Sequence, residues 1–436
     1  MASLAGGPGE STERVQERLS EGGCRFVIPR QAPTYTWTDL AVAWRLASSG
    51  ADAFGMLTRW FQQTYGRKHV LYFNRAQTGM FRLLREVAAS KEVVMPAYTC
   101  IVVPEAALWA KCRVRFADID LRDLNMNLPE LVTALTPETH AIIATHQFGI
   151  PCQIEEITQL AHERGFYVIE DAAPALGARW DGRLVGTWGN ASFFSFEDTK
   201  VISAGGGGVA LMDDSDLAGR LAVDGPQRSS SRDLAHASRC VRSKLQCTPS
   251  VYASGLRLFL RRNGWPTADR GGMSASPVHA APRWTRFGAS LALTQLPHLQ
   301  RNLADRRRIA ATFSGLLDGR VGIEVLHPDT RALPSWVRYP VRVGDKHRFW
   351  RHMTAQGIDL SWSFDYVCGA NASSAHSESV RARHASGRSI NLPLWVGMSN
   401  EVTEQVALAS LDCIARAAVG SSGTPRAGIT RPAACA

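Results

Sequence analysis

Short apolar runs and longer amphipathic stretches alternate along residues 69–171. The short runs predict strands at 69–74, 92–95, 114–118, 141–145 and 167–171. The stretches between them have helical spacing, most clearly at 78–89 and 157–164. Strands that alternate with helices predict an α/β fold with a mostly parallel central sheet.

The pattern differs on both sides of this region. One helix is predicted from Thr38 to about Gln63, and another from Ala289 to Leu317. Residues 224–280 are rich in Ser, Arg and Gly and have no clear period, except for a basic amphipathic helix predicted at 250–262. Beyond residue 321 a smaller α+β pattern follows, with strands predicted at 336–343 and 391–394 and a closing helix from Asn400.

These changes predict the domain organisation. A chain of 436 residues is long enough for roughly two to three domains. We expect a disordered N-terminal extension at 1–30, a large domain at 31–320 with an insertion at about 224–280, a small C-terminal domain at 321–418 and a loose tail at 419–436.

Charge and cysteine usage narrow the function classes. The net charge is +10, and basic residues are densest between Arg220 and Arg286, which is typical of a solvated basic face. No helix-turn-helix or zinc-finger pattern is present, so a nucleic-acid partner is not expected. The nine cysteines include no C-x-x-C pair, so neither a metal site nor a disulfide framework is expected, and a cytoplasmic location is predicted. The sequence contains no run of about 18 apolar residues, so a membrane-spanning helix is not expected.

Asp171 and Lys200 are the first candidates for chemistry. Asp171 ends an apolar strand, where ligands bind in open α/β sheets, although an Asp at this point could equally cap a helix. Lys200 follows an aromatic strand and precedes the glycine run 205–208, which favours partial burial of its amine, although it could be an ordinary surface lysine. Pyridoxal 5'-phosphate (PLP) needs a lysine for covalent attachment and an acid beside its pyridine nitrogen. Together the two residues therefore indicate a PLP site.

A phosphate-binding turn is predicted at residues 74–79. This turn links a strand to a helix, whose N-terminus offers free N–H groups and a positive dipole end. Thr78 adds a hydroxyl, and Ser195, five residues before Lys200, adds another. A plain connection without ligand-binding function remains the alternative for this turn.

Several motifs in order resemble the DegT-type sugar-aminotransferase family, which are fold-type-I PLP enzymes. The resemblance runs from about residue 60 to 413, excluding roughly 224–280. It is carried by Met95-Pro96-Ala97-Tyr98-Thr99, His146-Gln147-Phe148-Gly149, Ile169-Glu170-Asp171-Ala172-Ala173, Phe194-Ser195-Phe196-Glu197-Asp198-Thr199-Lys200 and Asn391-Leu392-Pro393-Leu394.

The resemblance implies a role for each site residue. Lys200 would hold the cofactor covalently and move the proton during transfer, and Asp171 would pair with the pyridine nitrogen. Gln77, Thr78 and Ser195 would hold the phosphate. Family members are homodimers in which a residue of the other subunit reaches the phosphate. Arg283 matches that residue when counted back from Gln295-Leu296, although a surface arginine is the plain alternative.

Some positions depart from the family pattern. Pro174 replaces the usual Gln or His three residues after the Asp, and Cys100 replaces the usual aromatic residue stacked on the cofactor ring. Ser363-Phe364-Asp365-Tyr366 replaces a sugar-facing His-Tyr-Pro-like stretch. These changes leave PLP binding expected and make an ordinary nucleotide-sugar substrate less certain.

The predicted activity is a PLP-dependent aminotransferase. It would move an amino group from an amino-acid donor, glutamate or glutamine by family analogy, to a keto group of a sugar or sugar-like intermediate. One alternative keeps PLP and Lys200 but carries out elimination, dehydration or other carbanion chemistry on an unusual substrate. A second alternative is a non-catalytic regulatory or scaffold protein.

Overall fold

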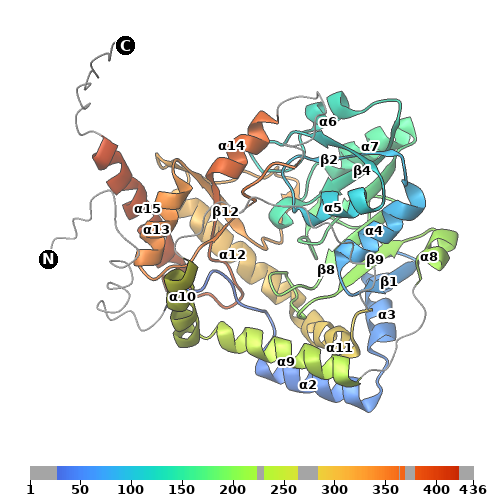
Figure 1. Cartoon of the computed structure of the whole chain (residues 1–436), viewed down its shortest axis with the longest axis horizontal. Coiled ribbons are helices and arrows are strands. Elements are labelled where there is room, and N and C mark those ends of the chain that lie inside the picture. Colours follow the sequence, from blue (N-terminus) through green and yellow to red (C-terminus); the bar gives the residue numbers. More distant parts are fainter. Residues whose placement is uncertain (1–26, 223–229, 264–282, 363, 369–378, 422–436) are drawn as a thin grey trace, which may run out of the picture.

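A seven-stranded sheet forms the centre of the chain (Figure 1). The computed structural model describes residues 27–222, 230–263, 283–362, 364–368 and 379–421. The strand order is β1 (His69–Phe73), β9 (Gly208–Met212), β8 (Ala191–Ser195), β5 (Tyr167–Asp171), β4 (Thr139–Thr145), β2 (Glu92–Pro96) and β3 (Arg113–Ala117). β9 is antiparallel to both of its neighbours, and every other neighbouring pair is parallel. The predicted α/β fold with a mostly parallel sheet is confirmed.

Helices cover both faces of this sheet. One face is covered by α4 (Ala76–Val87), α5 (Val102–Trp109) and α8 (Ser215–Leu221). The core on the other face includes α3 (Ala53–Tyr65), α6 (Leu128–Ala134), α7 (Ile154–Arg164) and α11 (Arg286–Gln295), and α2 (Trp37–Ser49) packs on α11. Side chains alternate along a strand. Ile169 therefore packs against the face that carries α4, α5 and α8, and Val168 packs against the opposite face. Burial on both faces explains why these strands are almost continuously apolar.

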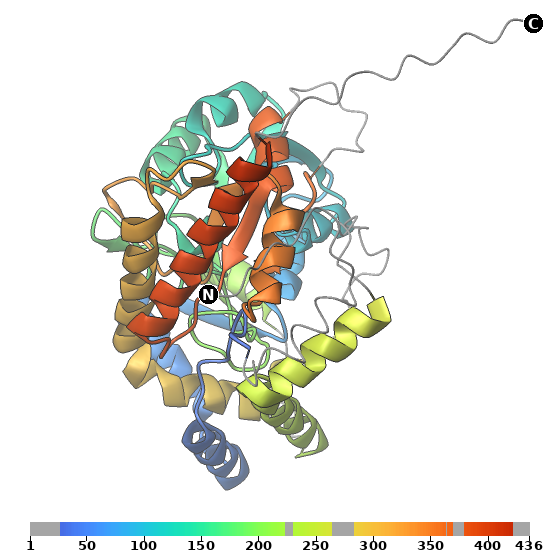
Figure 2. The ribbon, with the colours of Figure 1, turned by 90° about the vertical axis from the view of Figure 1, so that its left-hand side faces the viewer.

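A smaller four-stranded sheet has its own core. Its order is β10 (Ile323–Glu324), β12 (Tyr339–Val343), β14 (Ser389–Leu392) and β13 (Ser361–Trp362), and all pairs are antiparallel. Its helices are α12 (Leu299–Leu317), α13 (Lys346–Ala355), α14 (Val380–Arg388) and α15 (Asn400–Ser421). Figure 2 faces this part of the molecule, with α15 and α13 in front of the sheet. A third sheet joins β11 (Ala332–Leu333), β6 (Arg179–Trp180) and β7 (Arg183–Leu184).

Two predicted helices are interrupted in the structure. The helix expected from Thr38 to Gln63 is two helices, because Gly50 adopts a left-handed conformation (φ 85°) that ends α2 and Asp52 caps α3. The helix expected from Ala289 to Leu317 is divided into α11 and α12 by a 3-10 turn, Leu296–His298, that contains Pro297. Both interruptions lie at residues that commonly end or begin helices.

The insertion is more regular than its sequence indicates. The predicted helix at 250–262 is confirmed as α10 (Pro249–Asn263). A second helix, α9, precedes it and spans Ser230–Gln246, where the sequence shows no clear period. The buried side chains of α9 are only His236 and Cys240, one turn apart, which explains the missing apolar period.

The predicted terminal segments are only partly described. Most of the expected N-terminal extension and most of the expected tail lie outside the described residues. Within 27–30, Ile28 forms a parallel bridge with Ile358, so this part of the predicted extension is ordered. None of the described helices is both long and apolar enough to cross a bilayer. The described residues also contain no group of His, Cys, Asp or Glu suited to a metal ion.

Candidate active site

The sheet topology gathers the predicted site residues at one edge. β1, β2, β4, β5 and β8 run in the same direction, so their carboxyl ends lie together. Asp171 ends β5 and Ser195 ends β8. The helix that carries Gln77 and Thr78 starts three residues after β1, and Cys100 follows β2 by four residues. This edge is where a ligand is expected in an open α/β sheet.

Asp171 is a buried carboxylate with few hydrogen bonds. The residue is 5 % exposed. One oxygen accepts from the Ala173 N–H at 3.2 Å, and the other is 3.5 Å from the Thr145 hydroxyl, which is long for a hydrogen bond. Burial raises the pKa of Asp171, and the positive charge of Lys200 partly opposes that shift. The carboxylate therefore has capacity left for a cationic or N–H partner.

Lys200 lies in a turn whose backbone is held on both sides. Its N–H donates to the Glu197 carbonyl at 2.9 Å, and its carbonyl lies 3.4 Å from Nη2 of the buried Arg306. Loss of hydration lowers the pKa of Lys200, and the charge of Arg338 lowers it further, while Cys100 and Asp171 raise it. Asp171 and Cys100 follow strands that end at this edge of the sheet, and Arg338 lines a cavity together with Thr199, the residue before Lys200. A depressed pKa favours the free amine that a nucleophilic lysine needs.

The N-terminus of α4 has free hydrogen-bonding capacity. Its N-cap residue, Arg75, makes no side-chain capping bond. Thr78 Oγ1 is buried and has no partner among the described residues. The Gln77 side chain is engaged elsewhere, because its Nε2 donates to Glu105 at 3.0 Å. Ser195 Oγ accepts only a long bond, 3.5 Å, from the Glu197 N–H. Two hydroxyls and the first backbone N–H groups of α4 are thus available for an anion.

The glycine run closes against this helix start. The Gly207 N–H donates to the Asn74 carbonyl at 2.9 Å. A Cβ atom on Gly208 would lie 2.2 Å from the Ala76 nitrogen, so no larger residue fits there without movement of the backbone. Gly207 has φ +113° and lies under the Trp284 ring. Glycine is therefore required for the close approach between this loop and α4.

Arg283 lies beside the same part of its own chain. Its carbonyl accepts from Arg232 of α9 at 2.7 Å, and its positive charge reaches Arg82 of α4, whose pKa is lowered first by burial. The neighbouring Trp284 packs on Phe196 with a centroid separation of 4.9 Å. The predicted contact of Arg283 with a phosphate of a second subunit stays a prediction.

The three departures from the family pattern have distinct surroundings. The Tyr98 ring packs edge-on against Phe364, with centroids 5.3 Å apart. Cys100 is the residue that interacts electrostatically with both Lys200 and Asp171, and burial raises the pKa of its thiol. The Pro174 carbonyl accepts from the Ser335 hydroxyl at 2.9 Å. Of the residues that depart from the family pattern, Cys100 is therefore the one that interacts with Lys200 and Asp171.

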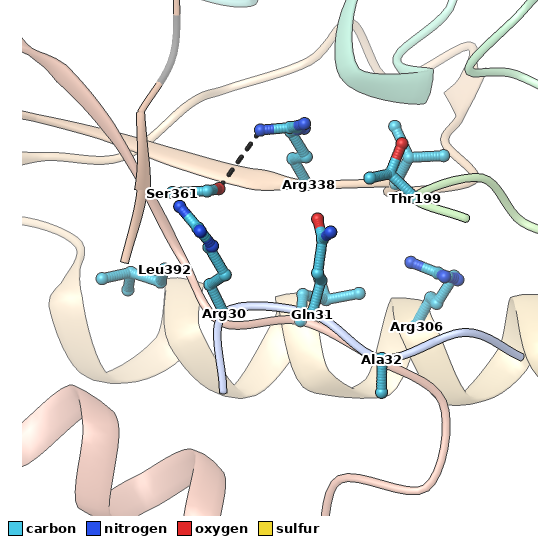
Figure 3. Close-up of a pocket in the computed structure, with 10 residues that line it drawn as sticks. Arg30, Gln31, Ala32, Thr199, Arg306, Arg338, Ser361 and Leu392 are labelled. Atoms are coloured by element: carbon cyan, nitrogen blue, oxygen red, sulfur yellow. Dashed lines mark hydrogen bonds between the residues drawn. The ribbon is translucent and has the colours of Figure 1, made fainter. Parts of the chain in front are cut away.

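A small cavity that sequence reasoning missed lies next to Thr199, the residue before Lys200. Figure 3 shows Arg30, Gln31, Arg306 and Arg338 around it, next to Thr199. The missed residues are the three arginines. One signal was available, because Arg338 is a charged residue within the apolar run 336–343 that predicts a strand. No sequence pattern indicated Arg30 or Arg306.

The fold matches known aminotransferase structures. TlmJ, an aminotransferase from Streptoalloteichus hindustanus, superposes with a TM-score of 0.70 at 23 % identity over 90 % of this chain and 100 % of that chain. The PLP form of Spr1654 from Streptococcus pneumoniae, a putative sugar aminotransferase, superposes with a TM-score of 0.69 at 19 % identity over 90 % and 99 %. At these identities the match establishes the fold.

Sequence relatives point to the same family. GDP-perosamine synthase from Caulobacter vibrioides is 26 % identical over 309 residues, which is 70 % of each chain. The uncharacterized protein MJ1066 of Methanocaldococcus jannaschii is 34 % identical over 165 residues, which cover 37 % of this chain and only 43 % of the relative. The model of the DegT/DnrJ/EryC1/StrS aminotransferase family matches residues 49–410. The chain therefore belongs to the DegT/DnrJ/EryC1/StrS aminotransferase family.

Proposed function

We propose that this protein is a PLP-dependent aminotransferase that moves an amino group from an amino-acid donor to a keto group of a sugar or sugar-like intermediate. One observation carries the proposal. The fold brings Lys200 and Asp171 to one edge of the sheet, where each shifts the pKa of the other. A lysine and an acid in this arrangement would supply the two groups that PLP requires, which supports the proposal.

The residues present fit the cofactor. The unpartnered Thr78 hydroxyl and the uncapped start of α4 suit a phosphate, with Ser195 beside them. Gln77 would contribute its backbone N–H, since its side chain is bound to Glu105. Asp171 has room for the N–H of a protonated pyridine ring. Cys100, close to both Asp171 and Lys200, would replace the usual aromatic contact with the ring.

The protein's own groups divide the work of the reaction. When bound, PLP supplies a carbonyl carbon that takes up the donor's nitrogen and a ring that accepts electrons. Asp171 would keep the ring nitrogen protonated. Lys200 would act through Nζ, first as the point of attachment and then as the base that moves the proton at the donor carbon. Its lowered pKa supports this second role, because only the neutral amine accepts a proton.

The substrate class is inferred from the relatives. Their names include GDP-perosamine synthase and dTDP-4-dehydro-2,3,6-trideoxy-D-glucose 4-aminotransferase. Glutamate or glutamine is the proposed donor. A homodimer, in which Arg283 of each copy approaches the phosphate of the other, is part of the proposal.

A half-reaction experiment tests this function. Purified protein loaded with PLP is mixed with L-glutamate or L-glutamine, and the absorbance of the lysine-bound cofactor is followed. The proposal predicts conversion to the amine form with release of the 2-oxo acid, followed by transfer of nitrogen to a keto-sugar. Release of ammonia or water from a substrate without any amino product would favour elimination instead. Absence of any cofactor binding would favour the non-catalytic alternative.

A further inference from the structure

The cavity beside Lys200 is lined by an excess of positive charge. Arg30, Arg306 and Arg338 line it, together with Thr199, the residue before Lys200 (Figure 3). Arg306 is 2 % exposed. Buried cations usually have an anionic partner, because removal of a charge from water is costly. Neither Arg306 nor Arg338 makes an ion pair within the described residues, so the neutral contacts of each guanidinium distinguish a ligand-binding role from a structural one.

Arg338 has no acidic partner among the described residues. Its Nη1 lies 3.2 Å from the Ser361 hydroxyl and 3.3 Å from the Trp362 carbonyl, and it makes no ion pair within the part of the chain that the structure describes. Burial lowers its pKa, and Arg30 adds to that shift. The guanidinium is thus held in place by neutral groups, with donors left for an anion.

The other two arginines of the cavity have different tasks. Arg306 donates to the Trp336 carbonyl at 3.1 Å and approaches the Lys200 carbonyl, so it positions the two segments that carry Arg338 and Lys200. Arg30 lies 3.4 Å from Asp359, and its side chain is 45 % exposed. Because Arg30 already has an acidic partner and contact with water, it is less suited to bind a ligand strongly.

We propose that Arg338 binds the α-carboxylate of the amino-acid donor; this inference rests on the proposed function. In the donor half-reaction, the donor's amino group would be exchanged for an oxygen atom that water supplies, the Lys200 amine would be freed, and the donor would leave as a 2-oxo acid. The carboxylate is attached to the carbon that bears the amine, so a donor that reacts at Lys200 needs a cation close to that lysine. Arg338 is close enough for its charge to act on Lys200. A guanidinium also matches a carboxylate with two parallel hydrogen bonds.

The first test measures binding without turnover. Glutarate, a dicarboxylate with no amino group, is titrated calorimetrically into the PLP-loaded wild type and into Arg338→Gln. A charge-assisted pair predicts that the dissociation constant rises about 10- to 100-fold in the variant. Arg338→Lys should recover only part of the affinity, because lysine keeps the positive charge but cannot donate two parallel hydrogen bonds to a carboxylate. Equal affinity of wild type and Arg338→Gln would overturn the proposal.

Arg342→Gln is the matched control. Arg342 lies four residues further along the same segment, but it is paired with Glu324 at 2.7 Å and does not line the cavity. Its replacement should leave glutarate affinity unchanged. If Arg338→Gln does not fold, Arg338→Lys takes its place and should still bind glutarate more weakly than the wild type does. Equal affinity of that variant and the wild type would contradict the role of Arg338.

A second comparison separates the donor from the acceptor as the source of the anion. UDP, GDP and dTDP are titrated into the same variants. Loss of nucleotide binding with unchanged glutarate binding would assign Arg338 to the acceptor's phosphates and overturn the proposal. The fate of the proposed function is read separately. Glutarate is also titrated into the cofactor-free protein. If Lys200 never takes up PLP but glutarate binding still depends on Arg338 there, the aminotransferase assignment fails while the carboxylate site stands.

Discussion

Two neighbouring carboxylates on β5, Glu170 and Asp171, point to opposite faces of the sheet and have opposite environments. Glu170 is fully buried and accepts backbone N–H bonds from Gly186 at 2.6 Å and from Trp188 and Gly189 at 2.7 Å. His146 Nε2 lies 3.2 Å from it. The Asp171 carboxylate has one hydrogen bond of 3.2 Å and one long contact of 3.5 Å, and the charge of Lys200 acts on it.

Their pKa shifts follow from this difference. Burial alone would raise the pKa of Glu170, but the bonds from His146 and the backbone outweigh burial and lower it. For Asp171, burial dominates and the pKa is raised. A buried carboxylate whose hydrogen bonds are satisfied thus stabilises the fold, whereas one with few bonds is available to a ligand. Strand alternation alone is enough to separate these two roles in adjacent residues.

The largest expected effect is on turnover in Asp171→Ala. Without the acid partner the ring is a weaker electron acceptor, so kcat should fall about 10²- to 10³-fold, as when other charge-stabilising groups are removed. PLP content should fall much less, because Lys200 and the phosphate contacts remain. Parallel measurement of kcat and of bound cofactor checks this. Normal turnover in Asp171→Ala would show that Asp171 is not the acid partner of the cofactor and would contradict its functional difference from Glu170.

The next effect is on stability in Glu170→Ala. This change leaves two buried backbone N–H groups and one part-buried one without an acceptor, so the free energy of unfolding should fall by about 3 kcal/mol or more. Glu163→Ala on the exposed side of α7 is the control and should change it by less than about 0.5 kcal/mol. Urea unfolding of both variants measures the difference. A loss in Glu170→Ala no larger than in the control would contradict the structural role of Glu170.

pH dependence should have opposite sign for the two acids. The folded-state pKa of Glu170 is lowered, so its contribution is present above the ordinary value of about 4.3 and is lost as the pH falls through the folded value. The folded-state pKa of Asp171 is raised, so its ionisation costs stability as the pH rises through the raised value.

Two amide variants test these signs in the cofactor-free protein. Glu170→Gln should reduce the fall in the free energy of unfolding at acid pH, by about 1.4 kcal/mol for each unit by which the Glu170 pKa differs between the folded and unfolded states. Asp171→Asn should instead gain stability relative to wild type toward neutral pH. Unfolding curves at several pH values report both slopes, and slopes of the same sign would refute the comparison.

The smallest effect is expected in Thr78→Val. The Thr78 hydroxyl is buried without a partner among the described residues, so its removal should not lower the stability of the cofactor-free protein. Loss of one phosphate hydrogen bond should raise the PLP dissociation constant about 5- to 10-fold. Thr133→Val, exposed on α6, is the control for cofactor titration. Unchanged PLP affinity would place the phosphate elsewhere.

The parallel sheet and its two key residues could be predicted from the sequence. Strands buried on both faces are apolar throughout, so the sequence predicts β5 and shows Asp171 at its end. Lys200 was identified as a candidate because it lies between an aromatic strand and a glycine run. The break between α2 and α3 was also marked, by Gly50 and Asp52, but the apolar spacing on both sides concealed it.

Other features depended on tertiary contacts that no local pattern encodes. α9 buries little more than His236 and Cys240, so it has no apolar period. The cavity arginines come from three distant segments, at residues 30, 306 and 338, and only the fold brings them to Thr199. The occupied Gln77 side chain depends on Glu105 of the next helix, and sequence could not indicate that pairing.

The most direct test of the account is reduction with borohydride followed by mapping of the modified residue. Purified protein is incubated with PLP, reduced, digested and analysed by mass spectrometry, with Lys200→Ala treated in parallel. The account predicts a phosphopyridoxyl group on the peptide that contains Lys200 and none in the variant. Modification of other lysines with Lys200 unmodified, or no stoichiometric modification at all, would contradict the assignment of this edge of the sheet as the active site.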